Sequence, residues 1–298
     1  KRFTSGELKE RPMFTSCCPG WVNFVSKRYP TYLRNLSTAK SPQQMFGAMA
    51  KTYFARKKGI DPHNICCISI MPCVSKKREA ALSYMRSAGA GQDVDVVLTT
   101  RELVRMIRAE HINPRFLKDQ QFDSPLGEST GAGVIFGVTG GVMEAALRTA
   151  YAVAEGKNPD ADAFRAVRGE NGRREADFVL GDRTLHTCTV SGLGNAEKLM
   201  QDIINGKVNY DFVEVMACPG GCVGGGGQPI HDGCELAGSR GGRLYQLDRE
   251  RELRFSHENP EVQKAYEEFL GKPLSHKAHE LLHSGHVNEL YYETHNYL

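Results

Sequence analysis

The chain has 298 residues, 40% of them hydrophobic and 24% charged, with a formal net charge of +3 at pH 7. This balance is typical of a globular protein with a sizeable core, and it argues against a protein dedicated to nucleic-acid binding. No run approaches the roughly 18 apolar residues that span a membrane. The 9 cysteines, an odd number, lie partly inside apolar runs, which indicates reduced thiols or metal ligands rather than a small disulfide-bonded scaffold.

The first predicted elements surround two adjacent cysteines, Cys17 and Cys18. A helical pattern follows Pro19 and should end before Pro30. A second helix is predicted over residues 42–54, where a serine and a proline supply a capping hydroxyl and a suitable first turn. Taken alone, the cysteine pair is best interpreted as two small buried hydrophobic residues.

Two apolar runs further along the chain predict strands. Residues 64–71 (NICCISIM) read as a fully buried strand, which would place Cys66 and Cys67 in the core. Residues 93–99 predict a second strand, followed by a helix whose cap is Thr100.

The middle of the chain is rich in glycine. Residues 133–141 lack the Gly-Lys-Ser/Thr ending of a P-loop and the GxGxxG spacing of a Rossmann turn, so a nucleotide site is not favoured. A helix is predicted over residues 142–155, and strands and turns over residues 163–190, with Cys188 in the core. The remaining elements predicted here are a helix over residues 196–205 and a strand over residues 212–216.

The last third of the chain is charged and predicted to be helical over residues 261–270 and 277–283. Four histidines cluster there: His276, His279, His283 and His286. The middle two are one helical turn apart and could form a zinc pair, but the polar composition and the missing HExxH motif favour a solvated helical face. Cys234, in a loop after a glycine run, is predicted to be a surface thiol.

The alternation of strands and helices predicts an α/β fold with parallel sheets. In such sheets, ligands bind at the carboxyl ends of the strands. Cys73 and Cys218 both follow predicted strands, and the pair Cys17 and Cys18 stands just before a helix. Three loops could therefore point thiolates into one cleft.

Residues 214–229 (EVMACPGGCVGGGGQP) place Cys218 and Cys222 among six glycines. Glycine lets the backbone approach a bulky group closely. Two cysteines cannot fill a four-coordinate site, so the other loops must supply thiolates. Four thiolates suit zinc or a cubane iron–sulfur cluster, and the glycines and apolar flanks favour the cluster. A radical-SAM motif would need a third nearby cysteine, and the ligand pairs of a zinc ribbon lie closer in sequence.

Three stretches together resemble the signature motifs of [FeFe]-hydrogenases: residues 15–21 (TSCCPGW), residues 71–79 (MPCVSKKRE) and residues 214–229. Five further segments extend the resemblance: residues 35–44 (NLSTAKSPQQ), 98–103 (LTTREL), 123–127 (DSPLG), 137–148 (GVTGGVMEAALR) and 256–260 (SHENP). The match runs from about residue 12 to about residue 283. Three long motifs in the same order make a specific signal.

The resemblance implies a fold of two lobes, each with twisted, mainly parallel sheets flanked by helices, and an active site in the cleft between them. We expect the lobes to cover about residues 1–125 and 126–298. The family's H-cluster is a [4Fe-4S] cubane joined through a cysteine sulfur to a diiron unit with CO, cyanide and azadithiolate ligands. The activity that the resemblance implies is the reversible reduction of protons to H2.

Motif position also implies a role for individual residues. The cubane ligands would be Cys18, Cys73, Cys218 and Cys222, the last also bridging to the diiron unit. The proton path would include Cys17, as a free thiol donor, and Ser37. The diiron unit would be surrounded by Gln43, Met71, Lys76, Phe136 and Met216, with the lysine beside a cyanide. A buried ammonium suits an anionic ligand, amide donors suit a diatomic ligand, and Phe and Met side chains limit water.

The resemblance also sets expectations for partners. Two glutamates of the family's proton path would fall upstream of Lys1, so we expect a chain truncated at its N-terminus; Val138 stands where alanine is more usual. The implied partners are ferredoxin or iron–sulfur domains as electron donor, and maturation proteins that insert the diiron unit. The expected compartment is the cytoplasm, with the periplasm as the alternative. Two functional alternatives stay open: a sensory member that binds H2, and a non-catalytic relative from cytosolic iron–sulfur assembly.

Overall fold

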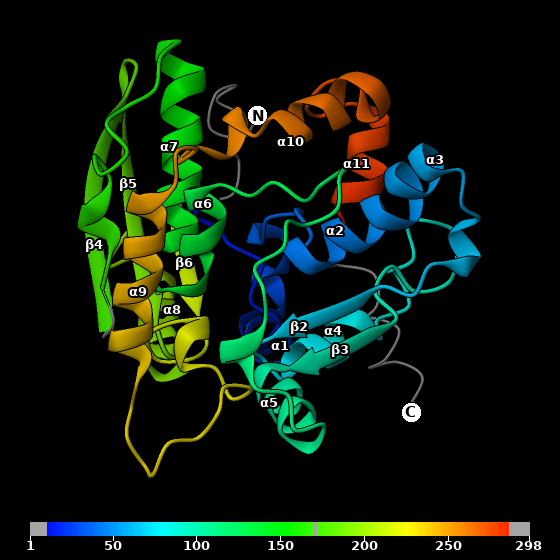
Figure 1. Cartoon of the computed structure of the whole chain (residues 1–298). Coiled ribbons are helices and arrows are strands. Elements are labelled where there is room, and N and C mark those ends of the chain that lie inside the picture. The colour runs from blue at the N-terminus through cyan, green and yellow to red at the C-terminus, as the bar shows by residue number, and fades with distance from the viewer. Residues whose placement is uncertain (1–10, 170–171, 286–298) are drawn as a thin grey trace, which may run out of the picture.

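The computed structural model describes residues 11–169 and 172–285, and its described strands form two separate sheets (Figure 1). The larger sheet has four strands in the order β1-β6-β5-β4. Strands β1 and β5 both pair with β6 in parallel, whereas β4 is antiparallel to β5. The bounds of these strands are β1 Met13–Phe14, β4 Gly172–Leu180, β5 Arg183–Ser191 and β6 Phe212–Met216.

The smaller sheet consists of β2 (Ile68–Met71) and β3 (Val96–Thr99), which pair in parallel. Strand β2 is followed by α4 (Ser75–Ala80), and β3 leads directly into α5 (Thr100–Ala109). Helices flank both sheets in Figure 1. The predicted α/β fold with mainly parallel sheets is therefore confirmed.

Strand β6 stands between two hydrophobic cores, because alternate residues of a strand point to opposite faces. On one face, Val213 packs in a cluster with Trp21 of α1 and Leu199 of α8. On the other face, Phe212 packs with Met143 of α7. Both cores hold β6 in place, so its carboxyl end is a rigid support. The helices that form these cores are α1 Pro19–Arg28, α7 Gly141–Glu155 and α8 Leu193–Ile204.

The prediction of a fully buried strand at residues 64–71 is wrong. The side chains of Ile68 and Ile70 are 56% and 49% exposed. Cys66 is exposed and Cys67 half-buried, so neither belongs to the core. The physical reason is that the described part of this sheet has two strands, and one of its faces is open to solvent. The other two predictions about single cysteines are confirmed: Cys188 is buried and Cys234 is exposed.

Two helix predictions need correction as well. The cap of α5 is Thr99 and not Thr100: its hydroxyl accepts from the Glu102 amide at 3.1 Å, and the Glu102 carboxylate accepts from the Thr99 amide at 2.7 Å. Helix α9 (Ala237–Glu250) was not expected, because its sequence contains three glycines and no clear apolar stripe. It lies beside α6 (Gly131–Val134) in the structure.

The helical pattern near the C-terminal end packs against the second predicted helix. That helix runs as α2 (Pro42–Met49), a π-helical turn and α3 (Ala55–Lys58). Met49 and Tyr53 pack with Leu281 of α11 (His276–Leu282), and α10 (Pro260–Ala265) joins the same cluster. None of the described helices is both long and apolar enough to cross a membrane.

The histidines of α11 differ in their surroundings. His276 and His279 are exposed, as expected of a solvated face, but His283 is half-buried. The Nδ1 atom of His283 lies 2.9 Å from the Thr38 hydroxyl, and its ring stacks on His279 with centroids 4.8 Å apart. Residue His286 lies outside the described residues.

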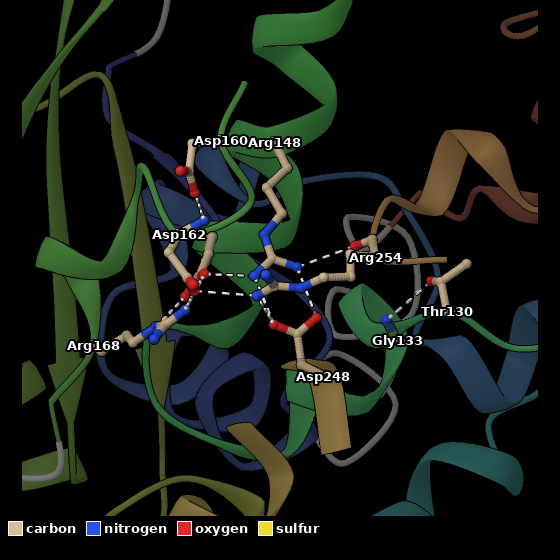
Figure 2. A network of polar contacts seen from close by, with 9 residues as sticks. Thr130, Gly133, Arg148, Asp160, Asp162, Arg168, Asp248 and Arg254 are labelled. Carbon is tan, nitrogen blue, oxygen red and sulfur yellow. Dashed lines mark hydrogen bonds and ion pairs between the residues drawn. The ribbon is translucent and has the colours of Figure 1, made fainter. Parts of the chain in front are cut away.

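A buried network of charges ties α7 to α9 and to the segments that follow each helix (Figure 2). The Arg148 guanidinium donates to Asp248 through both terminal nitrogens, at 3.0 and 2.9 Å, and to Glu144 at 2.7 Å. The side chains of all three residues are fully buried. Arg254 pairs with the same aspartate, and Arg168 with the same glutamate.

Candidate metal-cluster site

Three loops carry the cysteines that the sequence singles out. Strands β1 and β6 are parallel neighbours, so the loops after them emerge at the same edge of the large sheet. The first loop ends at Cys18, which is the N-cap residue of α1, and the second holds Cys218 and Cys222. Cys73 follows the carboxyl end of β2 in the small sheet. The carboxyl edges of both sheets therefore supply thiols to one region.

Backbone contacts bring the three loops together. The Ala217 amide donates to the Cys18 sulfur at 3.4 Å, and the Gly227 amide donates to the Pro72 carbonyl at 3.0 Å. A Cβ atom at Gly227 would stand 2.8 Å from the Cys73 nitrogen, and one at Gly225 would stand 2.1 Å from the Pro72 oxygen. These two glycines are required because no side chain fits between the loops.

The four predicted cluster thiols influence one another electrostatically. Burial raises the pKa of Cys222 to about 12, and the neighbouring Cys18 and Cys73 add to this rise. Burial also raises the pKa of Cys218, where the same two cysteines contribute. These contributions agree with the loop contacts, which bring the segments that carry the four cysteines side by side. Their role as cluster ligands stays a prediction.

The arrangement of these thiols bears on the kind of group that they could bind. Among residues 11–169 and 172–285, no three His, Cys, Asp or Glu side chains are arranged around a position for one metal ion. A zinc ion would need its thiolates about 2.3 Å away, whereas a cubane spreads its four thiolates over four iron atoms. Whether these four thiols bind a cluster therefore stays a prediction.

Cys17 lies apart from this set, at the wall of a cavity of about 360 Å³. Burial raises the pKa of Cys17, the adjacent Cys18 adds to the rise, and the Lys76 ammonium opposes it. Ser37 and Phe136 line the same cavity, and most other wall residues are apolar. The structure therefore brings three of the predicted site residues around one space, while Gln43 and the other pocket residues lie outside that wall.

Lys76 is buried, with 6% of its surface exposed, so a solvated lysine face is excluded. Its ammonium donates to the Cys17 carbonyl at 2.9 Å and to both carboxylate oxygens of Glu79 at 3.0 Å. A positive charge therefore lies in contact with the backbone of the loop that carries Cys17 and Cys18. The charge is held there by a carboxylate that has other hydrogen bonds of its own.

Gln43 braces that ion pair. Its amide nitrogen donates to Glu79 at 2.8 Å and to the Lys76 carbonyl at 3.2 Å, and its amide oxygen accepts from the Ser69 hydroxyl at 2.8 Å. Both amide hydrogens thus have protein acceptors, and contact with a bound ligand stays a prediction. The two predicted methionines are the last residues of strands: Met71 ends β2 and Met216 ends β6.

Two carboxylates of this region were not singled out from the sequence as site residues. Glu79 also accepts from the Ser41 hydroxyl at 2.7 Å, and its spacing of three from Lys76 on a helix is the signal that could have found it. Glu214 is fully buried and accepts from the Gly140 and Met143 amides at 2.6 Å, at the start of α7. Burial raises the pKa of Glu214 to about 7. No local sequence pattern indicates that Glu214, on an otherwise apolar strand, has a role at the site.

Comparisons with known proteins agree with this geometry. The family model of the iron only hydrogenase large subunit, C-terminal domain, matches residues 1–226, and that of the iron hydrogenase small subunit matches residues 235–293. The NADP-reducing hydrogenase subunit HndD of Solidesulfovibrio fructosivorans is 50% identical over 274 residues, which cover 92% of this chain and 46% of that protein. The cytosolic Fe-S cluster assembly factor narfl of Xenopus tropicalis is 31% identical over 285 residues, covering 93% and 59%.

Among solved structures, the apo [FeFe]-hydrogenase HydA1 of Chlamydomonas reinhardtii matches with a TM-score of 0.82 and 41% identity. The match covers 95% of this chain and 78% of that one. The chain spans about half the length of the curated relatives named above. With a family model over most of its length, and with four thiols gathered beside a buried lysine, this chain belongs to the iron-only, or [FeFe]-, hydrogenase family.

Proposed function

We propose that the chain is the H-cluster domain of an [FeFe]-hydrogenase and takes part in the reversible reduction of protons to H2. The observation that carries this proposal is that backbone contacts bring together the three distant loops of Cys18, Cys73, Cys218 and Cys222. Cys17, adjacent to Cys18 in the chain, lies at the wall of a cavity. The four thiols would hold a [4Fe-4S] cubane, and the diiron unit with its CO, cyanide and azadithiolate ligands would attach through Cys222. When bound, this group would relay electrons from an external donor and would supply the metal site at which protons and H2 interconvert.

The role proposed for Cys17 is to deliver and retake the proton. A free thiol has a pKa of about 8.5 in water. Because burial raises the pKa of Cys17 further, the residue keeps its proton at neutral pH and is ready to act as an acid. Ser37 shares the cavity wall and can pass a proton on through its hydroxyl. Most of the remaining wall residues are apolar, which limits the number of other groups that could carry the proton.

The role proposed for Lys76 is electrostatic. Its ammonium is buried and is aimed at the cysteine loop by the Glu79 carboxylate. A fixed cation in a site with little water stabilises an anionic ligand better than a solvated one does. The cyanide ligands of the diiron unit are such anions. Gln43 and Ser41 hold the glutamate and so fix the direction of the lysine.

Infrared spectroscopy of protein produced together with the hydrogenase maturation proteins is the decisive experiment. Metal-bound CO and cyanide give bands that no amino acid gives, and we expect these bands in the matured chain. A protein that takes up four irons but never shows the bands would instead be a scaffold, as the assembly-factor relatives suggest. Catalytic and sensory members would both show the bands, and H2 turnover would then separate them.

Replacement of Cys17 by serine tests the proton path. Cys17→Ser keeps the size of the side chain but removes the acidic thiol, so we expect the full infrared spectrum with nearly all H2 turnover lost. The measurement is best made in a fusion with the upstream residues of a full-length relative. Turnover at the wild-type rate would remove Cys17 from the path, and loss of the cubane would make it a ligand.

The proposed partners follow from the same assignment. A ferredoxin or an iron–sulfur domain would supply electrons to the cubane, and separate maturation proteins would insert the diiron unit. The names of the relatives include both periplasmic and cytosolic proteins. We propose a cytoplasmic location for this chain, which localisation of a tagged full-length protein would test.

A further inference from the structure

The glycine run after Cys222 needs contacts from elsewhere in the molecule to hold it in one conformation. Residues 224–227 are four consecutive glycines, which lose more conformational entropy on ordering than any other residues. They have no side chains with which to anchor themselves in a core. Yet this run must stay in place, because Gly225 and Gly227 pack directly on the loop that carries Cys73. Some other part of the molecule has to fix it.

Arg101, in the first turn of α5, holds the run from one side. Its terminal Nη2 donates to the Gly226 carbonyl at 2.8 Å and to the Gln228 carbonyl at 2.9 Å. Its Nε donates to the same Gln228 oxygen at 3.0 Å, and its backbone amide donates to the Gly227 carbonyl at 2.9 Å. Arg101 therefore donates to three consecutive carbonyls, those of residues 226–228. Figure 1 shows this loop reaching from β6 toward α5 before it returns to α9.

Arg240, on α9, holds the same loop from its two ends. Its Nη1 donates to the Val223 carbonyl at 3.0 Å, and its Nη2 donates to the Pro229 carbonyl at 3.2 Å. Within the described ranges, 11–169 and 172–285, no carboxylate forms an ion pair with Arg240 or Arg101. Backbone carbonyls are thus the partners of both guanidinium groups. A planar guanidinium can bridge two carbonyls in this way, whereas an ammonium is a point charge.

We propose that Arg101 and Arg240 are positioning residues for the iron–sulfur cluster: they clamp the Cys222 loop against the Cys73 loop and so set the spacing of the four thiols. The inference rests on the proposed function, since it assumes that these thiols hold a cubane. Neither arginine needs to touch the cluster. Each acts through the backbone of residues 223–229, which links Cys222 to the rest of the fold.

The experiment uses the full 298-residue chain, reconstituted anaerobically with iron and sulfide. The variants are Arg101→Met and Arg101→Lys. The first removes both the planar guanidinium group and the charge, whereas the second removes the guanidinium group and keeps the charge. The matched control is Arg105→Met, one turn further along α5, where the arginine is exposed. The measurements are iron per chain, the rate of iron transfer to a chelator, and the electron paramagnetic resonance spectrum of the reduced cluster.

We expect Arg101→Met and Arg101→Lys to release iron roughly 10-fold faster than wild type or more, which is the usual scale for groups that orient metal ligands. Their resonance spectra should shift, because the thiolate geometry around the cluster changes. Arg105→Met should match wild type in both respects. Should Arg101→Met fail to fold, Arg101→Lys decides by itself, because it keeps the charge and the length of the side chain.

Two other outcomes have distinct meanings. If the Arg101→Lys chain keeps the wild-type release rate and spectrum, the clamp is overturned while the cluster assignment stands. If the wild-type chain binds no cluster, the ligand assignment itself is wrong. The Arg240→Met variant should repeat the effect at a smaller size, since it removes two hydrogen bonds where Arg101→Met removes three.

Discussion

Two groups of charged side chains in this molecule differ in the partners that their charges contact. Around Arg148, three arginines face Glu144, Asp162 and Asp248, and each guanidinium pairs with carboxylates of the same network. Figure 2 shows the arginines with the two aspartates. Around Lys76, one ammonium meets one glutamate and also reaches the carbonyl of Cys17. The first network is closed on itself and joins α7 to α9. The second is open toward the thiols, so its charge is available to whatever binds there.

The largest expected effect comes from removing a thiol in the open region. Cys18→Ala or Cys73→Ala deletes one of four proposed ligands, and we expect the cubane to be lost in either variant. Cys188→Ala, in the core of the large sheet, is the matched control and should cost packing alone, about 1 kcal/mol. Iron counts per chain after reconstitution measure this. Equal losses in all three variants would contradict the ligand assignment.

The closed network should matter for stability and not for the cluster. Arg148→Met leaves Glu144 and Asp248 buried with one arginine partner each, and breaking a buried ion pair costs about 3–5 kcal/mol. We expect the low end of that range, because both acids keep a partner. Urea unfolding of the metal-free chain gives the value. At temperatures where this variant is folded, its iron content should equal that of wild type.

The open network should show the reverse pattern. Lys76→Met keeps the stem of the side chain and removes the charge, while Glu79 retains the hydrogen bonds from Ser41 and Gln43. We therefore expect a smaller stability loss, about 1–3 kcal/mol, with the cubane formed and the diiron unit poorly retained. Infrared intensity per cubane reports this retention. Wild-type intensity in the variant would show that the lysine charge is not used at the site.

The pH dependence of stability should have opposite signs for two carboxylates. Burial raises the pKa of Glu214 to about 7, so the folded chain binds a proton that the unfolded chain releases near pH 4. This group favours folding most at low pH, and its contribution declines as the pH rises from about 4 to about 7. Burial alone would raise the pKa of Asp162 as well, but hydrogen bonds from Arg254 and Arg168 hold it at about 2. Its contribution is present above about pH 4 and is lost as the pH falls toward 2.

Urea midpoints of the metal-free chain between pH 5 and pH 8 separate the two groups, since Asp162 is ionised throughout that range. The Glu214→Gln variant should lack the decline of stability over this interval that wild type shows. An unchanged slope in the variant would mean that Glu214 ionises normally in the folded chain.

The sequence predicted most where one local pattern decided the structure. Helix α7 begins within one residue of its predicted start, and Cys188 lies in the core, because strong apolar periodicity fixes both. The prediction failed at Cys66 and Cys67, since an apolar strand does not reveal how many neighbours its sheet has. Whether a strand is covered depends on contacts between distant segments.

The candidate site also contains features that the sequence could predict and features that it could not. The proximity of the cysteine loops could be predicted because three long motifs name them together, while the ligand roles stay a prediction. The capping of α7 by Glu214 could not, because it depends on segments that meet only in three dimensions, whereas the Lys76–Glu79 pair has a local signal in its spacing of three on one helix. The arginine clamp is similar: nothing around Arg101 in the sequence indicates that its partners are carbonyls of residues 226–228.

The parallel pairing of β1 with β6 has a consequence for how the chain is made. Strand β1 is among the first described residues to leave the ribosome, yet its partner lies about 200 residues later. At synthesis rates of roughly 5–20 residues per second, Cys17 and Cys18 wait roughly 10–40 s before Cys222 exists. The proposed ligand set is therefore incomplete until Cys222 has emerged. We expect stalled nascent chains of increasing length to show thiol protection by iron only beyond that point.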